Sequence, residues 1–464
     1  MTDVRNDYEL CMDKLRGVGQ DHVLRWWDEL DDTGRCRLVE QINAIDFSLM
    51  TRLVEQLLRG ENGKFEGHIE PCPVVRLPKT EEDFAERGRM EAAGVDAISR
   101  GAVALLIAAG GQGSRLGYDA PKGVFPIGPI TGKSLFQVFA EKVIATQHRY
   151  HSTVPFYIMT STTNHDATIE FFRTNSFFGL DAANVMFFAQ DMLPAVDFSG
   201  KLILKAKDEL FWSPNGHGGT IKALSDSGAL DDMERRGVRY ISYHQVDNAL
   251  VKSVDPVFIG YHAARGADMS LKVLSKRDAE EKLGVVGYVE GTLSVIEYSD
   301  LGKELMRAGD MGNIAIHIIS VDFARRENEG GFRLPYHVAK KKIEYVDTSG
   351  RIVKPEKDNG IKFETFIFDA VRDAGHAVVF ESRREEEFAP VKSPDGEVSP
   401  ATARQALVNL FGRWLENAGV KVKRDTECNV TVKIEISPLF ALDGEELARK
   451  VKPGMKVEDE LLLE

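Results

Sequence analysis

The chain has 464 residues, of which 43% are hydrophobic and 28% charged, and its formal net charge is −13. This length predicts two or three domains of an ordinary globular protein, and the negative charge disfavours a nucleic-acid partner. The four cysteines lack metal-ligand spacing, and no secretory signal is recognisable, so we expect a cytoplasmic protein with reduced thiols. No apolar run approaches the roughly 20 residues of a membrane span, so we expect no membrane partner.

The first segment, residues 1–98, is predicted to be mainly helical. Its apolar residues recur at helical spacing in two stripes, one with Val23, Trp27 and Leu30 and one with Met50, Leu53, Val54 and Leu57. A looser stretch with three prolines, around residues 71–78, separates these helices from the second segment.

The second segment, residues 99–385, carries the pattern of an α/β domain. The continuous apolar run at 103–109 ends in glycines and predicts a strand buried on both faces. Similar runs recur at 156–159, 185–188 and 240–243, and amphipathic segments such as 135–143 lie between them. This alternation predicts a parallel, doubly wound sheet, in which ligands bind beyond the carboxyl ends of the strands.

The third segment, residues 386–464, is predicted to be a small C-terminal α+β domain. A helical stripe of four residues comes first: Leu407, Leu410, Phe411 and Trp414. Alternating apolar residues from Val430 to Ile436 then predict a strand with one solvated face.

The most informative motif is the glycine-rich loop directly after the first buried strand. It contains Gly110, Gly111 and Gly113, and Arg115 and Lys122 come shortly after. Glycines let a backbone approach a phosphate closely with its N–H groups, and the two cations supply the charge that a triphosphate needs. A plain strand-to-helix turn would explain the glycines, and solvated surface charges would explain the cations.

Two better-known glycine motifs fail to match by one position each. A dinucleotide fingerprint that starts at Gly111 requires a third glycine where Leu116 stands. The segment from Gly128 to Ser134 has one residue too few for a Walker loop. An NAD-dependent dehydrogenase is therefore disfavoured.

With its flanking residues, the loop from Leu106 to Gly123 resembles the nucleotide loop of the eukaryotic-type UDP-sugar pyrophosphorylases, and the chain is most similar to the UDP-N-acetylglucosamine pyrophosphorylases. Matching segments occur in the same order along nearly the whole chain. They include residues 19–22, 192–195, 246–248, 295–299, 312–315, 359–362 and 402–404. The resemblance implies a Rossmann-like mixed sheet of the nucleotide-sugar transferase type. It also implies attack by a sugar 1-phosphate on the α-phosphorus of UTP, which yields a UDP-sugar and pyrophosphate.

The resemblance also implies roles for the charged residues of this sequence. Arg115 and Lys122 match the basic pair on the triphosphate, and Lys392 matches a lysine brought to the phosphates from the C-terminal side, with Lys362 as a second candidate. Asp247, at the end of a predicted strand, matches a ligand of Mg²⁺, with Mn²⁺ as an alternative ion. Without the resemblance, such an aspartate is more often a turn or cap residue.

The remaining matched positions would bind the nucleotide and the sugar. The implied contacts are with the phosphates for Gly110 and Gly111, with uracil for Gln190, and with the base and ribose for the loop of Gly216 and His217. Gly284, Glu297, Tyr298 and Asn313 match positions that line the hexosamine pocket. Tyr298 has the alternative of core packing, and His217 that of a packed turn residue.

Three functions remain open at this stage. His217 replaces an asparagine that is usual in the hexosamine enzymes, so a UDP-glucose or broad UDP-hexose pyrophosphorylase is the nearest alternative. A non-catalytic UDP-sugar sensor on the same fold is a third reading, because a fold alone does not establish activity. The joint presence of Arg115, Lys122, Asp247 and Lys392 argues against the sensor.

Overall fold

The computed structural model of the protein describes residues 4–60, 65, 67–278, 280–302, 310–452 and 454–464. The chain forms two compact units, each built from separate stretches of sequence. The first unit contains the described residues of Met1–Lys64, Asp191–Gly219 and Leu334–Ile367. The second unit contains those of Phe65–Gln190, Thr220–Arg333 and Phe368–Glu464.

This division differs from the three consecutive segments that the sequence predicted, 1–98, 99–385 and 386–464. The first unit contains the N-terminal helices α1 to α3, but it also takes in two insertions from the middle of the chain. The reason is a shared core, in which Leu193, Val196 and Phe363 from the insertions are buried with Leu38 and Leu53 from the helices. Contacts between distant stretches of sequence therefore define this unit.

The first unit combines helices with short strands. Its helices are α1 (Val4–Gly17), α2 (Asp32–Ala44) and α3 (Phe47–Leu58), and two short 3₁₀ turns (Asp21–Leu24 and Trp27–Glu29) replace the predicted helix through Val23, Trp27 and Leu30. Its strands are β4 (Met192–Pro194), β5 (Val196–Asp197), β6 (Leu204–Ala206), β7 (Glu209–Leu210), β8 (Trp212–Pro214), β14 (His337–Lys341), β15 (Tyr345–Val346), β16 (Ile352–Val353) and β17 (Gly360–Glu364). β14, β17 and β5 form an antiparallel sheet.

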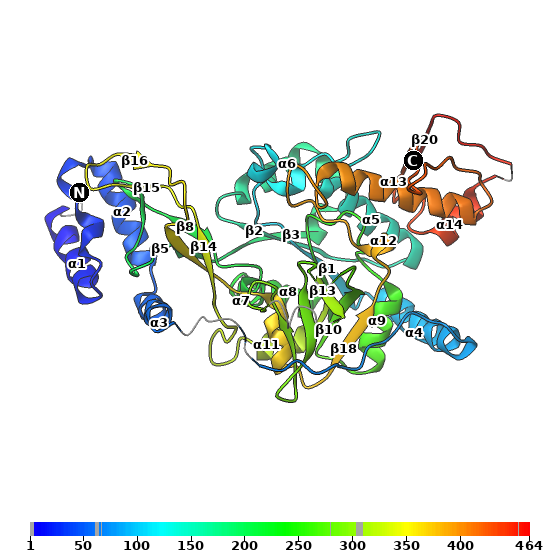
Figure 1. Ribbon diagram of the computed structural model, residues 1–464, viewed down its shortest axis with the longest axis horizontal. Coiled ribbons are helices and arrows are strands. Elements are labelled where there is room, and N and C mark those ends of the chain that lie inside the picture. Colours follow the sequence, from blue (N-terminus) through cyan, green and yellow to red (C-terminus); the bar gives the residue numbers. More distant parts are fainter. Residues whose placement is uncertain (1–3, 61–64, 66, 279, 303–309, 453) are drawn as a thin grey trace. The chain divides into compact units, whose positions relative to one another are not determined.

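The second unit is built on a mixed sheet that has nine strands among the described residues. Its main path runs β12-β11-β13-β9-β1-β2-β3, and β10 joins through β13 and pairs with β18. Figure 1 labels β1, β2, β3, β10, β13 and β18 of this sheet. The strands are β1 (Val103–Ala108), β2 (Phe156–Ser161), β3 (Val185–Gln190), β9 (Tyr240–Gln245), β10 (Met269–Ser275), β11 (Gly284–Val289), β12 (Thr292–Ile296), β13 (Met311–Ser320) and β18 (Ala377–Glu381). β9, β1, β2 and β3 are parallel, as predicted, whereas β13 is antiparallel to β9 and begins a mixed extension.

Helices cover this sheet. They are α4 (Glu81–Ser99), α5 (Leu135–Tyr150), α6 (His165–Thr174), α7 (Gly219–Asp226, whose first residue is assigned to the first unit), α8 (Ala229–Arg235), α9 (Pro256–Ala264), α11 (Val321–Arg326) and α12 (Arg384–Glu387). Because β1, β2, β3 and β9 run in one direction, their carboxyl ends meet at one edge, where Ala108 is level with Met159 and Gln245. The sheet therefore presents the loops after these four strands together.

The C-terminal residues belong to the second unit. α13 (Pro400–Asn417) begins at Ser399 with a capping box and is followed by β19 (Lys433–Ile436), α14 (Gly444–Lys450) and β20 (Glu460–Leu463). β19 covers only the end of the predicted strand at 430–436 and pairs in parallel with β20. The predicted helical stripe buries Leu407, Leu410 and Phe411 in the same core as the central sheet, which explains why no separate domain forms.

Two further observations concern the expected cellular context. The four cysteines, Cys11, Cys36, Cys72 and Cys428, are all free thiols. None of the described helices has both the length and the apolar character that crossing a bilayer requires.

Candidate active site

The glycine-rich loop follows β1 at the carboxyl edge of the sheet. Its carbonyl groups are held from α6 and the end of β2, because Asn164 donates to the carbonyls of Ala109 (2.9 Å) and Gly111 (3.2 Å) and the Ser161 hydroxyl donates to that of Gly110 (2.8 Å). Within the part of the chain that the structure describes, the N–H groups of Gly110 and Gly111 donate no hydrogen bond. A loop with fixed carbonyls and available N–H groups is suited to binding a phosphate.

The two glycines have different surroundings. A Cβ atom on Gly110 would lie 2.3 Å from Nε2 of Gln190, whereas one on Gly111 would meet nothing within 4 Å. Gly110 is therefore required for the close packing of Gln190. Gly111 faces open space in which a ligand can approach the backbone.

Both predicted cations of the loop are present, in different environments. Arg115 lies on a short 3₁₀ turn (Ser114–Leu116), is exposed, and forms no ion pair with any described residue. Lys122 is more enclosed, and its Nζ lies 3.1 Å from Oδ2 of Asp247. The structure thus brings two of the sequence-predicted residues into direct contact.

Asp247 lies just after β9 and is only 5% exposed. Burial by itself would raise the pKa of this carboxyl, but the positive charges of Lys122 and Lys392 outweigh that effect and hold the pKa below its ordinary value. Lys392 therefore acts on the same carboxylate as Lys122, although the two lysines lie far apart in the sequence. Asp247 is ionised at neutral pH, as a metal ligand must be.

Gln190 ends β3, the edge strand beside β2. It is 6% exposed, and its Oε1 atom has no hydrogen-bond partner among the described residues. A buried amide oxygen without a partner costs about 1–3 kcal/mol, so a ligand that supplies a donor would recover that energy. The imide N–H of uracil is such a donor, and the prediction for Gln190 is consistent with this geometry.

The predicted sugar-binding residues gather on the antiparallel extension of the sheet. Gly284 on β11 is paired with Asn313 on β13, and a Cβ on Gly284 would lie 3.2 Å from Oε2 of Glu297. Glu297 and the half-buried Tyr298 follow β12 directly. Near Gly284, the carboxylate of Glu297 and the amide of Asn313 can form hydrogen bonds with the hydroxyl groups of a sugar.

The other three predicted residues belong to the first unit. Gly216 has a φ of +84°, and a Cβ there would lie 2.4 Å from the carbonyl oxygen of Thr365. His217 accepts a hydrogen bond at Nδ1 from the N–H of Ile367 (3.3 Å) and packs beside Phe366 with ring centroids 5.4 Å apart. Lys362, on β17, lies over the ring of Phe211 at 5.0 Å. These contacts fix each residue within its own unit.

Sequence reasoning missed the residues that hold this site together. Ser161 and Asn164 belong to a Ser-Thr-Thr-Asn run at the end of β2, whose position after a buried strand was the available signal. His244, on β9, is buried, and burial lowers its pKa to about 3, so its neutral ring bridges the Gln245 carbonyl (3.0 Å) and the Ser253 hydroxyl (3.1 Å). Asn248 stood beside Asp247 in the same motif but had no predicted role.

A family model decides the evolutionary relationship. The model described as UTP–glucose-1-phosphate uridylyltransferase matches residues 75–441, which is most of the chain. The chain belongs to this family. The matched residues include all the candidate site residues of the second unit.

Several members of the family are similar to this chain over most of their length. A Homo sapiens UDP-N-acetylhexosamine pyrophosphorylase-like protein 1 is 41% identical over 88% of this chain and 85% of its own. The Saccharomyces cerevisiae UDP-N-acetylglucosamine pyrophosphorylase is 37% identical over 88% and 86%. The crystal structure of the Trypanosoma brucei uridine diphosphate N-acetylglucosamine pyrophosphorylase superposes with a TM-score of 0.80, at 28% identity over 99% and 98% of the two chains. The predicted fold and family are thereby confirmed.

Proposed function

We propose that this member of the family is a uridylyltransferase that joins UTP with an N-acetylhexosamine 1-phosphate and releases pyrophosphate. The observation that carries the proposal is the meeting of the open glycine loop, Lys122, Asp247 and Lys392 at one edge of the sheet. The names of the Homo sapiens and Saccharomyces cerevisiae relatives supply the substrate class.

In this proposal the protein works by positioning and by neutralising charge. The N–H groups of Gly110 and Gly111 bind phosphate oxygens, and Arg115 and Lys122 neutralise the charge that develops on the leaving pyrophosphate. Lys392, in the segment that follows α12, binds the phosphate of the sugar or the α-phosphate. Such a reaction needs no protein nucleophile, because the attacking oxygen belongs to the sugar 1-phosphate.

Asp247 is the residue that would hold Mg²⁺, or Mn²⁺ in its place. Among the described residues no group of three or more His, Cys, Asp or Glu side chains could hold a metal by itself. A single ionised carboxylate fits Mg²⁺, which is commonly bound by one or two carboxylates together with substrate phosphates and water. When bound, the ion would neutralise phosphate charge, and Lys122 supplies a second positive charge beside Asp247.

The base and sugar contacts complete the proposal. The amide oxygen of Gln190 has no hydrogen-bond donor among the described residues, and the imide N–H of uracil would donate to it. Glu297 and Asn313 are assigned to the sugar hydroxyls and the acetamido group, and Gly284 places no Cβ against the Glu297 carboxylate. Gly216, His217 and Lys362 keep their predicted roles toward the ribose, base and phosphates as part of the proposal.

A pyrophosphate-release assay tests this function. Purified protein is mixed with UTP, Mg²⁺ and one sugar 1-phosphate at a time: N-acetylglucosamine, N-acetylgalactosamine, glucose or galactose 1-phosphate. We expect release with an N-acetylhexosamine 1-phosphate. A clear preference for glucose 1-phosphate would support uridylyl transfer as the reaction but would make UDP-glucose the product. Glucose 1-phosphate is the substrate in the family's description. Bound UTP without release from any sugar would support a sensor instead.

We also propose a cytoplasmic location, on the ground that all four cysteines are free thiols. Fractionation of cells that express the tagged chain tests this proposal. Recovery in a membrane or secreted fraction would contradict it.

A further inference from the structure

Two segments that are far apart in the sequence meet at Asp247. The carbonyl of Asp247 accepts a hydrogen bond from the N–H of Val391 (2.9 Å), and Asn248 and Pro390 are paired as an antiparallel bridge. Lys392 is the next residue after Val391. The distance between the Lys392 ammonium and the Asp247 carboxylate is therefore set by how the segment 387–392 is attached to the loop after β9.

The side chain of Asn248 provides that attachment. Its Nδ2 donates to the carbonyl of Glu387 (2.6 Å), and its Oδ1 accepts from the N–H of Ala389 (3.1 Å). Asn248 is 4% exposed, so both bonds are protected from water. One amide thus uses a donor and an acceptor to fix two points of the segment that leads to Lys392.

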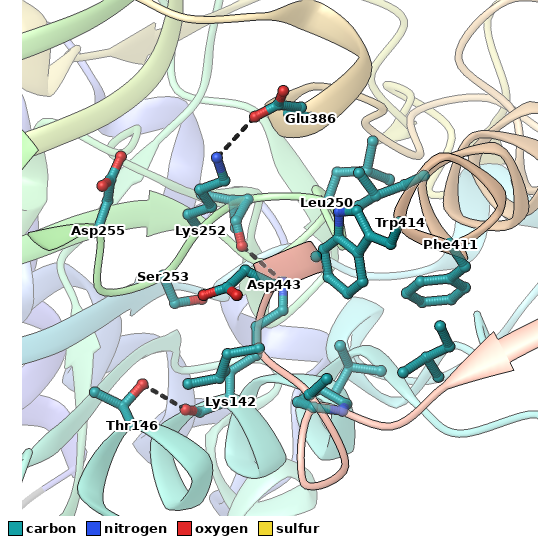
Figure 2. Close-up of a pocket in the computed structure, with 18 of the residues that line it drawn as sticks. Lys142, Thr146, Leu250, Lys252, Ser253, Asp255, Glu386, Phe411, Trp414 and Asp443 are labelled. Carbon is teal, nitrogen blue, oxygen red and sulfur yellow. Dashed lines mark hydrogen bonds and ion pairs between the residues drawn. The ribbon is translucent and has the colours of Figure 1, made fainter. Parts of the chain in front are cut away.

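A buried ion-pair network also holds the segment 387–392. The Glu387 carboxylate accepts from the N–H of Lys252 (3.0 Å) and pairs with Nζ of Lys272, which also lies 2.7 Å from Oδ2 of Asp255. Lys252 pairs with Glu386 at 2.8 Å, as Figure 2 shows. These contacts join α12 to the loop 248–255 at several points, so the segment has little freedom to move by itself.

The loop is also held from its other side. Lys142 on α5 donates from Nζ to the carbonyls of Ala249 and Val251, both at 2.7 Å. Beside this contact lies a cavity of about 550 Å³, lined by α5, residues 249–257 and the Phe411–Trp414 side of α13 (Figure 2). Because the loop is fixed on the α5 side, Asn248 transmits a defined position to the Lys392 segment rather than following its movements.

We propose that Asn248 is a positioning residue for uridylyl transfer, which sets the Lys392 ammonium against the Asp247 carboxylate and the phosphates. This inference rests on the proposed function. Asn248 touches neither substrate nor reacting atoms in this role, and acts only through Lys392. Misplacement of a reacting or charge-neutralising group by about 1 Å can cost about 100-fold in rate.

A double-mutant cycle tests the proposal in the full-length chain. Asn248→Ala, Lys392→Ala and the double variant are compared for kcat, for KM of each substrate and for UDP-sugar affinity. We expect Asn248→Ala to lower kcat by about 10- to 100-fold while UDP-sugar affinity changes by less than about threefold. In the Lys392→Ala background the same change should cost less than about threefold, because the group that it positions is absent.

Controls separate positioning from general damage. Asn328→Ala removes a comparable pair of amide hydrogen bonds, to the carbonyls of Ile221 (2.9 Å) and Ala324 (2.8 Å), neither of which belongs to the loop after β9 or to residues 387–392, and should leave kcat within about twofold. If Asn248→Ala does not fold, Asn248→Ser takes its place in the cycle, because the serine side chain is too short to bond both the Glu387 carbonyl and the Ala389 N–H. Equal losses from the Asn248 change in both backgrounds would overturn the proposal. A wild-type chain without turnover would instead overturn the proposed function.

Discussion

Replacing Lys272 with methionine removes the cation that pairs with two buried carboxylates, those of Asp255 and Glu387. Lys272 has no exposed surface, its Nζ lies 2.7 Å from Asp255, and it also pairs with Glu387. Two unit charges at that distance attract by about 6 kcal/mol at an effective dielectric constant of about 20, before desolvation is subtracted. Breaking a buried pair by removing one partner costs about 3–5 kcal/mol, and we expect a loss of that size in the free energy of unfolding at neutral pH.

The loss should depend on pH in a definite direction. Burial would raise the pKa of Asp255, but Lys272 and then Lys252 lower it to about 2. A carboxyl with a depressed pKa stabilises the wild type above its unfolded pKa of about 3.9, and this contribution disappears as the pH falls toward 2. Without Lys272 the desolvated carboxylates favour protonation, so their folded pKa values rise. The destabilisation by Lys272→Met should therefore be smaller at about pH 5 than at about pH 7.5.

Urea denaturation followed by far-UV circular dichroism measures this effect. Tryptophan fluorescence is less suitable, because Trp26, Trp27 and Trp212 belong to the first unit and only Trp414 to the second. Lys450→Met is the matched control, since its pair with Glu446 has a similar distance of 2.8 Å but a lysine side chain that is 41% exposed, and it should cost no more than about 1 kcal/mol. Substituting Asp255→Asn and Glu387→Gln together with Lys272→Met should recover most of the loss. A loss below about 1 kcal/mol, or an equal loss at both pH values, would refute the reasoning.

Three further predictions concern the candidate site. Lys122→Ala should lower kcat by at least about 100-fold and UDP-sugar affinity by less than about tenfold, because in the proposed function it neutralises the leaving pyrophosphate; equal losses in calorimetric binding and in turnover would contradict that role. Asp247→Ala should abolish the Mg²⁺ dependence of the residual activity, and an unchanged metal titration would place the ion elsewhere. Gly110→Ala should displace Gln190, whose Nε2 would lie 2.3 Å from the new Cβ, and weaken uridine nucleotide binding by about tenfold, whereas Gly88→Ala, with nothing within 4 Å, should bind normally.

The parallel half of the sheet could be predicted from sequence because its signal is local. The runs at 103–109, 156–159 and 240–243 are apolar at nearly every position, as strands covered on both faces must be, and each became a parallel strand. The glycine loop was predictable for the same reason, since β1 and the loop are adjacent in the chain. The antiparallel extension was not, because its pairing depends on contacts between distant residues.

The domain boundaries show the limit of local patterns. Leu193 and Phe363 lie in stretches of sequence that look like parts of the central domain, yet both are buried with the N-terminal helices. Val23 and Trp27 are also buried, but in short 3₁₀ turns rather than in the helix that their spacing predicted. Spacing reports which side chains are apolar, whereas the partner that covers them is a property of the tertiary structure.

The sequence by itself determined the family to which the chain belongs and supplied the candidate residues of the site. Arg115 and Lys122 stand out locally because a glycine-rich loop is encoded over a few residues, whereas Asp247 and Lys392 became candidates only through the resemblance to the family. Only the tertiary structure decided that Lys122 and Lys392 act on one carboxylate and that Asn248 ties the loop after β9 to the segment that leads to Lys392. These contacts join residues from separate parts of the chain, and a buried carboxylate between two lysines exists only once folding has excluded water around it.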